Sequence, residues 1–315
     1  MDWSKIAFVF PGQGSQTVGM GKDLVEAFPA ARETFAQADA ALGFSLSSLC
    51  FDGPAEALDD TLNTQPALYT TGVATLRALQ TALPEAIPAA VAGHSLGEFT
   101  ALAAAGAIRF EDGLRLVRER GRLMKAAGEQ NPGAMAALLG LDAPKVREVC
   151  AQASEQTGGT LILANDNCPG QVVISGDDRT IEVGMELAKA AGAKRAVKLA
   201  VSIAAHSPLM APAAAEFRKA LDATHFTLPS VPVYGNVEAQ PLASAEAIRD
   251  ELDRQLTSSV RWTETIQHMS AAGLTHFVEL GPKDVLVGLL KRINREATGT
   301  ALNSATALNT FLTAS

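Results

Sequence analysis

Short apolar runs alternate along most of the chain with longer segments in which apolar residues recur every three or four positions. Short runs that end at Gly or Pro are typical of buried strands, and the longer spacing is typical of helices that bury one face. The pattern therefore predicts an α/β fold. Outside the middle of the chain we expect strands at 5–10, 89–93 and 275–280 and helices at 96–107, 111–128 and 283–292.

The middle of the chain has a different order of elements. We expect strand 133–141, helix 143–156, strands 160–165 and 171–176, helix 179–191 and strand 195–201. This βαββαβ order is that of the ferredoxin-like fold. Because the alternation of strands and helices resumes afterwards, we predict a small ferredoxin-like domain (131–201) inserted into a large α/β-hydrolase-like domain (1–130 and 202–295). The remaining residues, 296–315, are rich in Ala, Thr, Asn and Ser, so we expect a weakly structured tail.

Composition narrows the class of protein. Of 315 residues, 47% are hydrophobic, and no apolar run approaches the roughly 18 residues that a membrane-spanning helix needs. The net charge of −8 disfavours non-specific binding of nucleic acid, which depends on neutralising phosphates. The three cysteines (Cys50, Cys150 and Cys168) are far apart, which favours reduced thiols over disulfides or a metal site. The first residues enter a strand pattern almost at once, without a charged region and cleavage site, so we expect no secretion signal. We expect a cytoplasmic protein with no metal and no membrane or nucleic-acid partner.

The segment Gly93-His94-Ser95-Leu96-Gly97 lies between a predicted strand and a predicted helix. A Gly-x-Ser-x-Gly sequence in this context is typical of a nucleophile elbow, a sharp turn that projects the serine hydroxyl above the sheet. Ser95 is therefore a candidate nucleophile, and the alternative is a serine that caps an ordinary turn. Glu98 falls in the first helical turn, where we expect it to complement the helix dipole.

A serine nucleophile needs a base, and His206 is the best placed of the five histidines. It lies between a predicted strand and a helix start at Ser207-Pro208, a junction at the rim of an α/β sheet. The alternative is a structural histidine. His94, inside the elbow, is expected to point away from the reactive side of Ser95. No Asp or Glu can be assigned to orient His206, which departs from a hydrolase triad.

Acyl transfer also needs two backbone donors for the developing oxyanion. The amide of Leu96, directly after the nucleophile, is the first candidate. The loop within 8–21, with Gln13 at its tip, is a candidate for the second, although a simple turn would have the same residues. A dinucleotide-binding loop is excluded, because Thr17 stands where that motif needs its third glycine.

Arg120 lies on the apolar side of its predicted helix. Its neighbours three and four positions away are Leu116, Val117, Leu123 and Met124. A buried guanidinium is unfavourable unless it is paired, and its planar shape suits two hydrogen bonds to a carboxylate. The partner could be a carboxylate of the protein or a carboxylate of a substrate, and the sequence leaves both open.

Six segments, in this order, carry a resemblance to a known family that covers about residues 5–292: "FVFPGQGSQ", "TQPAL", "GHSLGE", "RG" at 120–121, "NCPGQVVISG" and "HSPLM". The chain resembles the malonyl-CoA:acyl-carrier-protein transacylases, within the acyltransferases of fatty-acid and polyketide synthesis. The resemblance implies that Ser95 is the nucleophile and His206 the base. It also implies that Arg120 holds the malonyl carboxylate and that the Gln13 and Leu96 amides form the oxyanion hole.

The resemblance further implies that the main-chain carbonyl of Gln255 orients His206 and that Asn165 and Asn167 lie near the cleft. It implies a ping-pong reaction by a monomer with no bound cofactor, in which malonyl-CoA is the substrate and holo-acyl carrier protein the acceptor. Ala204-Ala205, before His206, departs from the residues often found in the family, so methylmalonyl-CoA or another acyl-CoA remains an alternative. The elbow and the histidine alone would also fit a serine thioesterase or esterase, which remains a second alternative.

Overall fold

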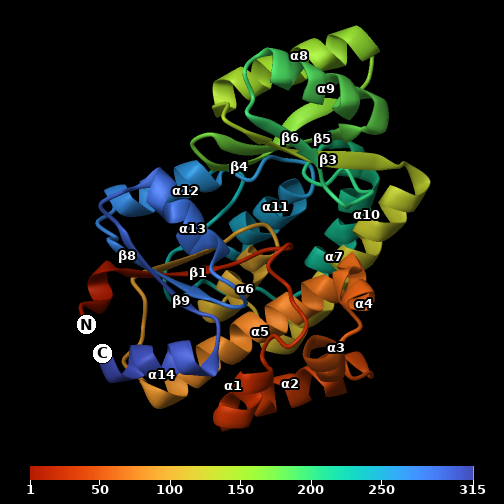
Figure 1. The fold of residues 1–315 in the computed structure, drawn as a ribbon. Coiled ribbons are helices and arrows are strands. Elements are labelled where there is room, and N and C mark those ends of the chain that lie inside the picture. The colour runs from red at the N-terminus through yellow and green to blue at the C-terminus, as the bar shows by residue number, and fades with distance from the viewer. Residues whose placement is uncertain (315) are drawn as a thin grey trace.

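The computed structural model describes residues 1–314, which contain two sheets (Figure 1). The larger sheet has five parallel strands in the order β7-β2-β1-β8-β9. The smaller sheet has four antiparallel strands in the order β4-β5-β3-β6. The strands are β1 (Ile6–Phe10), β2 (Ala90–Gly93), β3 (Gly133–Leu139), β4 (Leu161–Cys168), β5 (Gln171–Asp177), β6 (Arg195–Lys198), β7 (Val233–Tyr234), β8 (His276–Leu280) and β9 (Thr298–Leu302).

Helices cover both faces of the parallel sheet. In β1, Phe8 and Phe10 belong to one apolar cluster, and Ala7 and Val9 belong to another. Burial on both faces explains why β1 is a continuous apolar run rather than an alternating one. The helices of the N-terminal half are α1 (Lys22–Ala27), α2 (Pro29–Leu42), α3 (Leu46–Asp52), α4 (Ala55–Asp59), α5 (Thr61–Ala82), α6 (Gly97–Ala104) and α7 (Phe110–Gln130), after a short 3-10 turn at Trp3–Lys5.

The small sheet is packed by helices on one face only. Residues such as Val172 and Ile174 of β5 contact a cluster that includes Val146 of α8 and Ile181 of α9. Figure 1 shows these two helices on the side of the sheet that faces away from the parallel sheet. The remaining helices are α8 (Ala143–Thr157), α9 (Asp178–Ala190), a 3-10 turn (Pro208–Met210), α10 (Ala211–Asp222), α11 (Ala245–Gln255), α12 (Trp262–Ala271), α13 (Val285–Ile293) and α14 (Ala305–Ala314).

The expectation of a weakly structured tail at 296–315 is wrong for the described residues. Strand β9 pairs in parallel with β8 and completes the large sheet, and α14 follows it. Leu302 and Leu308 are fully buried, and Phe311 packs edge-on against Trp3. A few well-spaced apolar side chains are therefore enough to bind this segment to the core, although its composition is mostly Ala, Thr and Asn.

The strand predicted at 195–201 is shorter than expected. It ends at Lys198, and residues 199–205 cross without regular structure toward His206. The short strand β7 was not anticipated from the sequence. Within residues 1–314, no helix combines the length and the apolar character that crossing a membrane requires.

Candidate active site

Ser95 lies in a sharp turn between β2 and α6. Its φ angle is 51°, in the left-handed region that non-glycine residues rarely adopt. The flanking glycines allow a close approach of the backbone: a Cβ on Gly97 would lie 2.0 Å from the carbonyl oxygen of Phe10. Strand β1 and the start of α6 can therefore pack together only with glycine at this position. The Ser95 hydroxyl makes no capping bond to α6, whose N-cap residue is Leu96.

Asn236, in the loop after β7, holds this turn from the side. Its Oδ1 accepts a hydrogen bond from the Ser95 amide (2.6 Å), and its Nδ2 donates to the Gly93 carbonyl oxygen (2.7 Å). Asn236 is fully buried. A residue 141 positions away in the sequence thus fixes the strained backbone of the candidate nucleophile.

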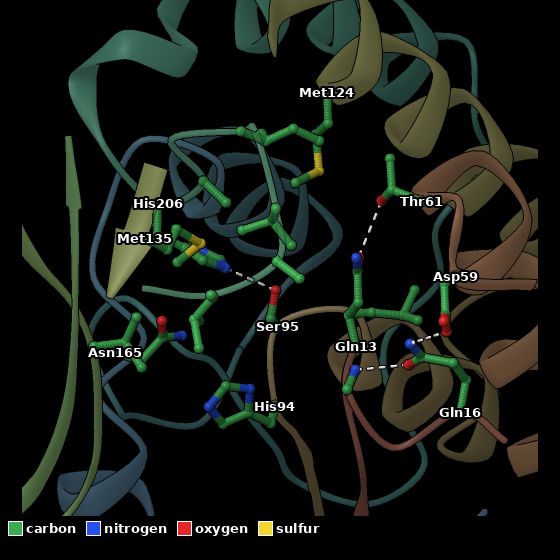
Figure 2. A pocket seen from close by; sticks show the side chains of 18 of the residues that line it. Gln13, Gln16, Asp59, Thr61, His94, Ser95, Met124, Met135, Asn165 and His206 are labelled. Carbon is green, nitrogen blue, oxygen red and sulfur yellow. Dashed lines mark hydrogen bonds between the residues drawn. The ribbon is translucent and has the colours of Figure 1, made fainter. Parts of the chain in front are cut away.

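His206 contacts the Ser95 hydroxyl directly (Figure 2). Its Nε2 lies 2.8 Å from Ser95 Oγ, and its Nδ1 lies 2.8 Å from the main-chain oxygen of Gln255. Because a carbonyl oxygen only accepts, Nδ1 carries the proton and Nε2 is free to accept the serine proton. The contact expected between His206 and the Gln255 carbonyl is present. Among the residues that the structure describes, no acidic side chain orients His206, although a hydrolase triad would have one.

The environment keeps His206 neutral. It is 4% exposed, and its φ angle is 59°, so it shares the left-handed conformation of Ser95. Burial and the nearby charge of Arg120 lower the pKa of His206 to about 3. A neutral imidazole is the form that a general base requires.

Arg120 lies on α7 and is 2% exposed, and its guanidinium reaches the Ser95 hydroxyl. Nη1 donates to Gln65 Oε1 and Nη2 to Gln255 Oε1, both at 2.9 Å, and Nη2 also lies 3.1 Å from Ser95 Oγ. Within residues 1–314, no carboxylate forms an ion pair with Arg120, so an internal salt bridge is not its role. Burial lowers the pKa of Arg120 to about 10, and the guanidinium stays charged at neutral pH.

The two candidate oxyanion donors are available. In the part of the chain that the structure describes, the main-chain amides of Gln13 and Leu96 donate to no other protein group. The loop that carries Gln13 is held in place: Thr61 Oγ1 donates to Gln13 Oε1 (3.0 Å), and Lys283 Nζ donates to the Gly14 carbonyl oxygen (3.1 Å). Both residues line the cavity that Ser95 also lines.

A cavity of about 420 Å³ joins these groups, and it lies between the two sheets. The small sheet contributes Met135, Asn165, Asn167 and Val173 to its wall. Asn165 lies beside Val260 in an isolated bridge, and Asn167 Oδ1 lies 2.8 Å from His94 Nε2. The volume of this cavity is within the range of small-molecule sites, roughly 300–1,000 Å³.

The expectation that His94 points away from the site is wrong. Figure 2 shows its ring near Ser95, and it lines the same cavity. The ring contacts Asn167 of the small sheet, 73 positions away in the sequence, and the local sequence does not reveal such a long-range contact.

Three further polar residues were missed: Thr61, Gln65 and Asn236. Only Gln65 carried a signal, because it lies in "TQPAL", one of the segments of the family resemblance. No group of three or more His, Cys, Asp or Glu side chains within the described residues is placed to hold a metal ion.

The comparisons with known proteins agree with this geometry. The acyl transferase domain family matches residues 7–309. The chain belongs to this family, and it is an acyltransferase. The malonyl CoA-acyl carrier protein transacylase of Escherichia coli strain K12 is 47% identical over 305 residues, which are 97% of this chain and 98% of that protein. The enzyme of the same name from Bacillus subtilis is 49% identical over 292 residues, 93% of this chain and 91% of the relative.

Solved structures of acyltransferases show the same fold. A crystal structure of an acyl carrier protein S-malonyltransferase from Vibrio cholerae has a TM-score of 0.93 at 44% identity, covering 98% of this chain and 99% of that one. A malonyl-transacylase in complex with a type II PKS acyl-carrier protein has a TM-score of 0.95 at 43% identity, covering 99% and 100%.

Proposed function

We propose that this acyltransferase moves a malonyl group from malonyl-CoA to the phosphopantetheine thiol of holo-acyl carrier protein. The observation that carries the proposal is the state of Arg120. Its guanidinium is buried beside Ser95 and is hydrogen-bonded to two neutral amide oxygens. A cation without an internal counter-ion favours an acyl group that brings its own carboxylate, as malonyl does. The names of the relatives support the same substrate and acceptor.

The first half-reaction loads the enzyme. His206 Nε2 takes the Ser95 Oγ proton as Oγ attacks the thioester carbonyl carbon, and the amides of Gln13 and Leu96 stabilise the oxyanion. When the C–S bond breaks, the imidazolium returns the proton to the CoA sulfur, and a malonyl-serine ester remains. The Gln255 carbonyl oxygen, on Nδ1–H, supports the imidazolium between these two steps.

The second half-reaction runs the same chemistry in reverse. The thiol of the carrier protein gives its proton to His206 and attacks the ester, and Ser95 leaves with that proton. Arg120 serves in both halves, because it holds the malonyl carboxylate while the thiol donor is exchanged. Asn165 and Asn167 line the same cavity, where we expect them to contact the substrate.

Other acyl donors are separate outcomes of the same test. Ala205 lines the cavity with a small side chain, which leaves methylmalonyl-CoA as a second donor to examine. A thioesterase or esterase would hydrolyse the acyl-serine ester quickly, whereas a transferase keeps it until a thiol arrives.

The arrangement of the two sheets also allows a proposal about the domains. We infer that residues 131–201 form an inserted ferredoxin-like domain, and that 1–130 and 202–295, extended by the segment 296–314, form an α/β-hydrolase-like domain. The strand order β4-β5-β3-β6 supports the first part, since it places the second and third strands of the unit side by side. We also propose a monomer active in the cytoplasm without a bound cofactor. All the proposed reacting groups come from one chain, and its three cysteines are free and buried.

Loading with radiolabelled acyl-CoA tests the proposal. We expect acid-stable label from malonyl-CoA, none with Ser95→Ala, and a shift of preference from malonyl toward acetyl with Arg120→Ala. Addition of holo-acyl carrier protein should remove the label from the enzyme and transfer it to the carrier. Rapid release of CoA with no retained label would instead establish a hydrolase, and labelling by acetyl-CoA alone would refute the role of Arg120.

A further inference from the structure

Glu98 has an environment that complementing a helix dipole does not explain. It lies in the first turn of α6 with no exposed surface. Its Oε2 accepts a hydrogen bond from Gln255 Nε2 (2.8 Å) and another from the Asn236 main-chain amide (3.2 Å). Its Oε1 has no hydrogen-bond partner in the described part of the chain. One oxygen of this carboxyl group therefore makes both of its contacts.

Both partners of Glu98 act on the site itself. The Nε2 group of Gln255 also donates to the Ser95 carbonyl oxygen (3.0 Å), and its Oε1 accepts from Arg120 Nη2. An amide has its donors at one end and its acceptor at the other. By accepting from Nε2, together with the Ser95 carbonyl oxygen, Glu98 favours the orientation in which the oxygen of Gln255, and not its NH₂ group, faces the guanidinium. Reversal of the amide would place two N–H donors against a cation.

We propose that Glu98 is a positioning residue: in its neutral, protonated form it fixes the Gln255 amide, and so presents Arg120 with its full charge to a substrate carboxylate. This inference rests on the proposed function. The protonation state matters because an ionised Glu98, only one side chain away from Arg120, would act as an internal counter-ion. It would then weaken the attraction between Arg120 and the malonyl carboxylate.

The surroundings of Glu98 favour the neutral form. The charged groups that face it are Glu251 on α11 and Arg120 on α7. Glu251 is also buried, and its Oε1 accepts from the Val237 amide, directly after the Asn236 amide that contacts Glu98. Burial, together with the Glu251 carboxyl, raises the pKa of Glu98 well above its usual range, and the attraction of Arg120 offsets this only in part.

The test compares Glu98→Gln with Glu98→Ala in the loading assay, with malonyl-CoA and acetyl-CoA as alternative donors. A glutamine keeps an acceptor oxygen for Gln255 and Asn236 and is neutral, so the malonyl-to-acetyl ratio of kcat/KM should stay within about threefold of the original. Alanine removes the acceptor, and the ratio should fall about tenfold, the effect of losing one buried hydrogen bond near a charge. Glu98→Ala should lower kcat/KM for malonyl-CoA and leave kcat/KM for acetyl-CoA largely unchanged.

Glu279→Gln is the matched control. Glu279 is equally buried, but its two oxygens accept from the Leu286 and Val287 amides at the start of α13, away from the cavity. This variant should keep the ratio. A second readout, the infrared band of a protonated carboxyl at neutral pH, should lose one component in Glu98→Gln, and it applies even if Glu98→Ala does not fold.

Each opposite result overturns the inference. An unchanged ratio in Glu98→Ala would mean a structural role only. A ratio that falls equally in Glu98→Gln would mean that the charge is needed, and so would an infrared band that Glu98→Gln leaves intact. If the unaltered enzyme takes no malonyl label at all, the proposed function has failed, and the infrared band still decides the protonation of Glu98.

Discussion

The five-stranded parallel sheet is covered by helices on both faces, whereas the four-stranded sheet has helices on one face and the cavity on the other. The ends of β1 and β2 carry Gln13 and Ser95, and helices packed beside them bring in Arg120 and Gln255. The small sheet contributes side chains such as Met135 and Val173 to the wall. The proposed reacting groups thus come from the parallel sheet and the helices packed on it, and the small sheet contributes part of the cavity wall.

His206 stands between the two regions. It lies on the chain that returns from β6 to α10, yet its contacts are with Ser95 and Gln255 in the large part. His206→Ala gives the largest expected effect, a loss of loading rate of about 10²–10⁴-fold, the usual contribution of a general base. Single-turnover malonyl labelling measures it. Circular dichroism checks that the fold is kept, and a loss below tenfold would contradict the assignment.

The stability of the parallel sheet can be separated from its chemistry. Leu308 of α14 is fully buried in the core cluster that contains β1 and β8 side chains, far along the chain from the site. Leu308→Ala should lower the free energy of unfolding by about 2–5 kcal/mol, the range for a buried leucine. Urea denaturation measures the change. The loading rate per folded molecule should stay the same, and a changed rate would link the tail to the site.

Adjacent residues of β5 test the two faces of the small sheet. Val173 lines the cavity, and Val172 packs under α8 and α9. Val173→Ala should change the KM for malonyl-CoA a few-fold, and it should also lower stability, because Val173 is itself buried in the main core cluster. Val172→Ala should leave the KM unchanged and lower stability by roughly 1.5 kcal/mol for two buried methyl groups. The same change of KM in both variants would mean that the two faces are not distinct.

The smallest expected effect is an absence of pH dependence. Since the pKa of His206 is about 3 in the folded protein, the first half-reaction should keep its rate from pH 7.5 to pH 5.5. A base with an ordinary pKa of about 6.5 would be about nine-tenths protonated at pH 5.5 and would slow it tenfold. Between these two pKa values the unfolded chain binds the proton and the folded chain does not, so this histidine lowers stability as the pH falls below about 6.5.

Local patterns were enough to predict an α/β fold and to single out the side chains that we propose to react. The apolar runs of β1, β2 and β8 and the glycines of the elbow are short-range signals, and Arg120 was found because its helical neighbours are apolar. The partners of these groups were harder to find. Gln65 and Asn236 reach the site across 55 and 141 positions, so no local spacing points to their contacts. The tail was misjudged because β9, with the sequence "TGTAL", pairs through its backbone.

The left-handed backbone of Ser95 and His206 has a further consequence. Among residues 1–314, only four non-glycine residues have positive φ, and these two are the proposed nucleophile and base. Glycine adopts that conformation without steric conflict, so at both positions the residue that chemistry requires is not the one that would make the chain most stable. Glycine at either position would relieve this strain and would also remove the side chain. Stability and the proposed chemistry therefore make opposite demands on the same two residues.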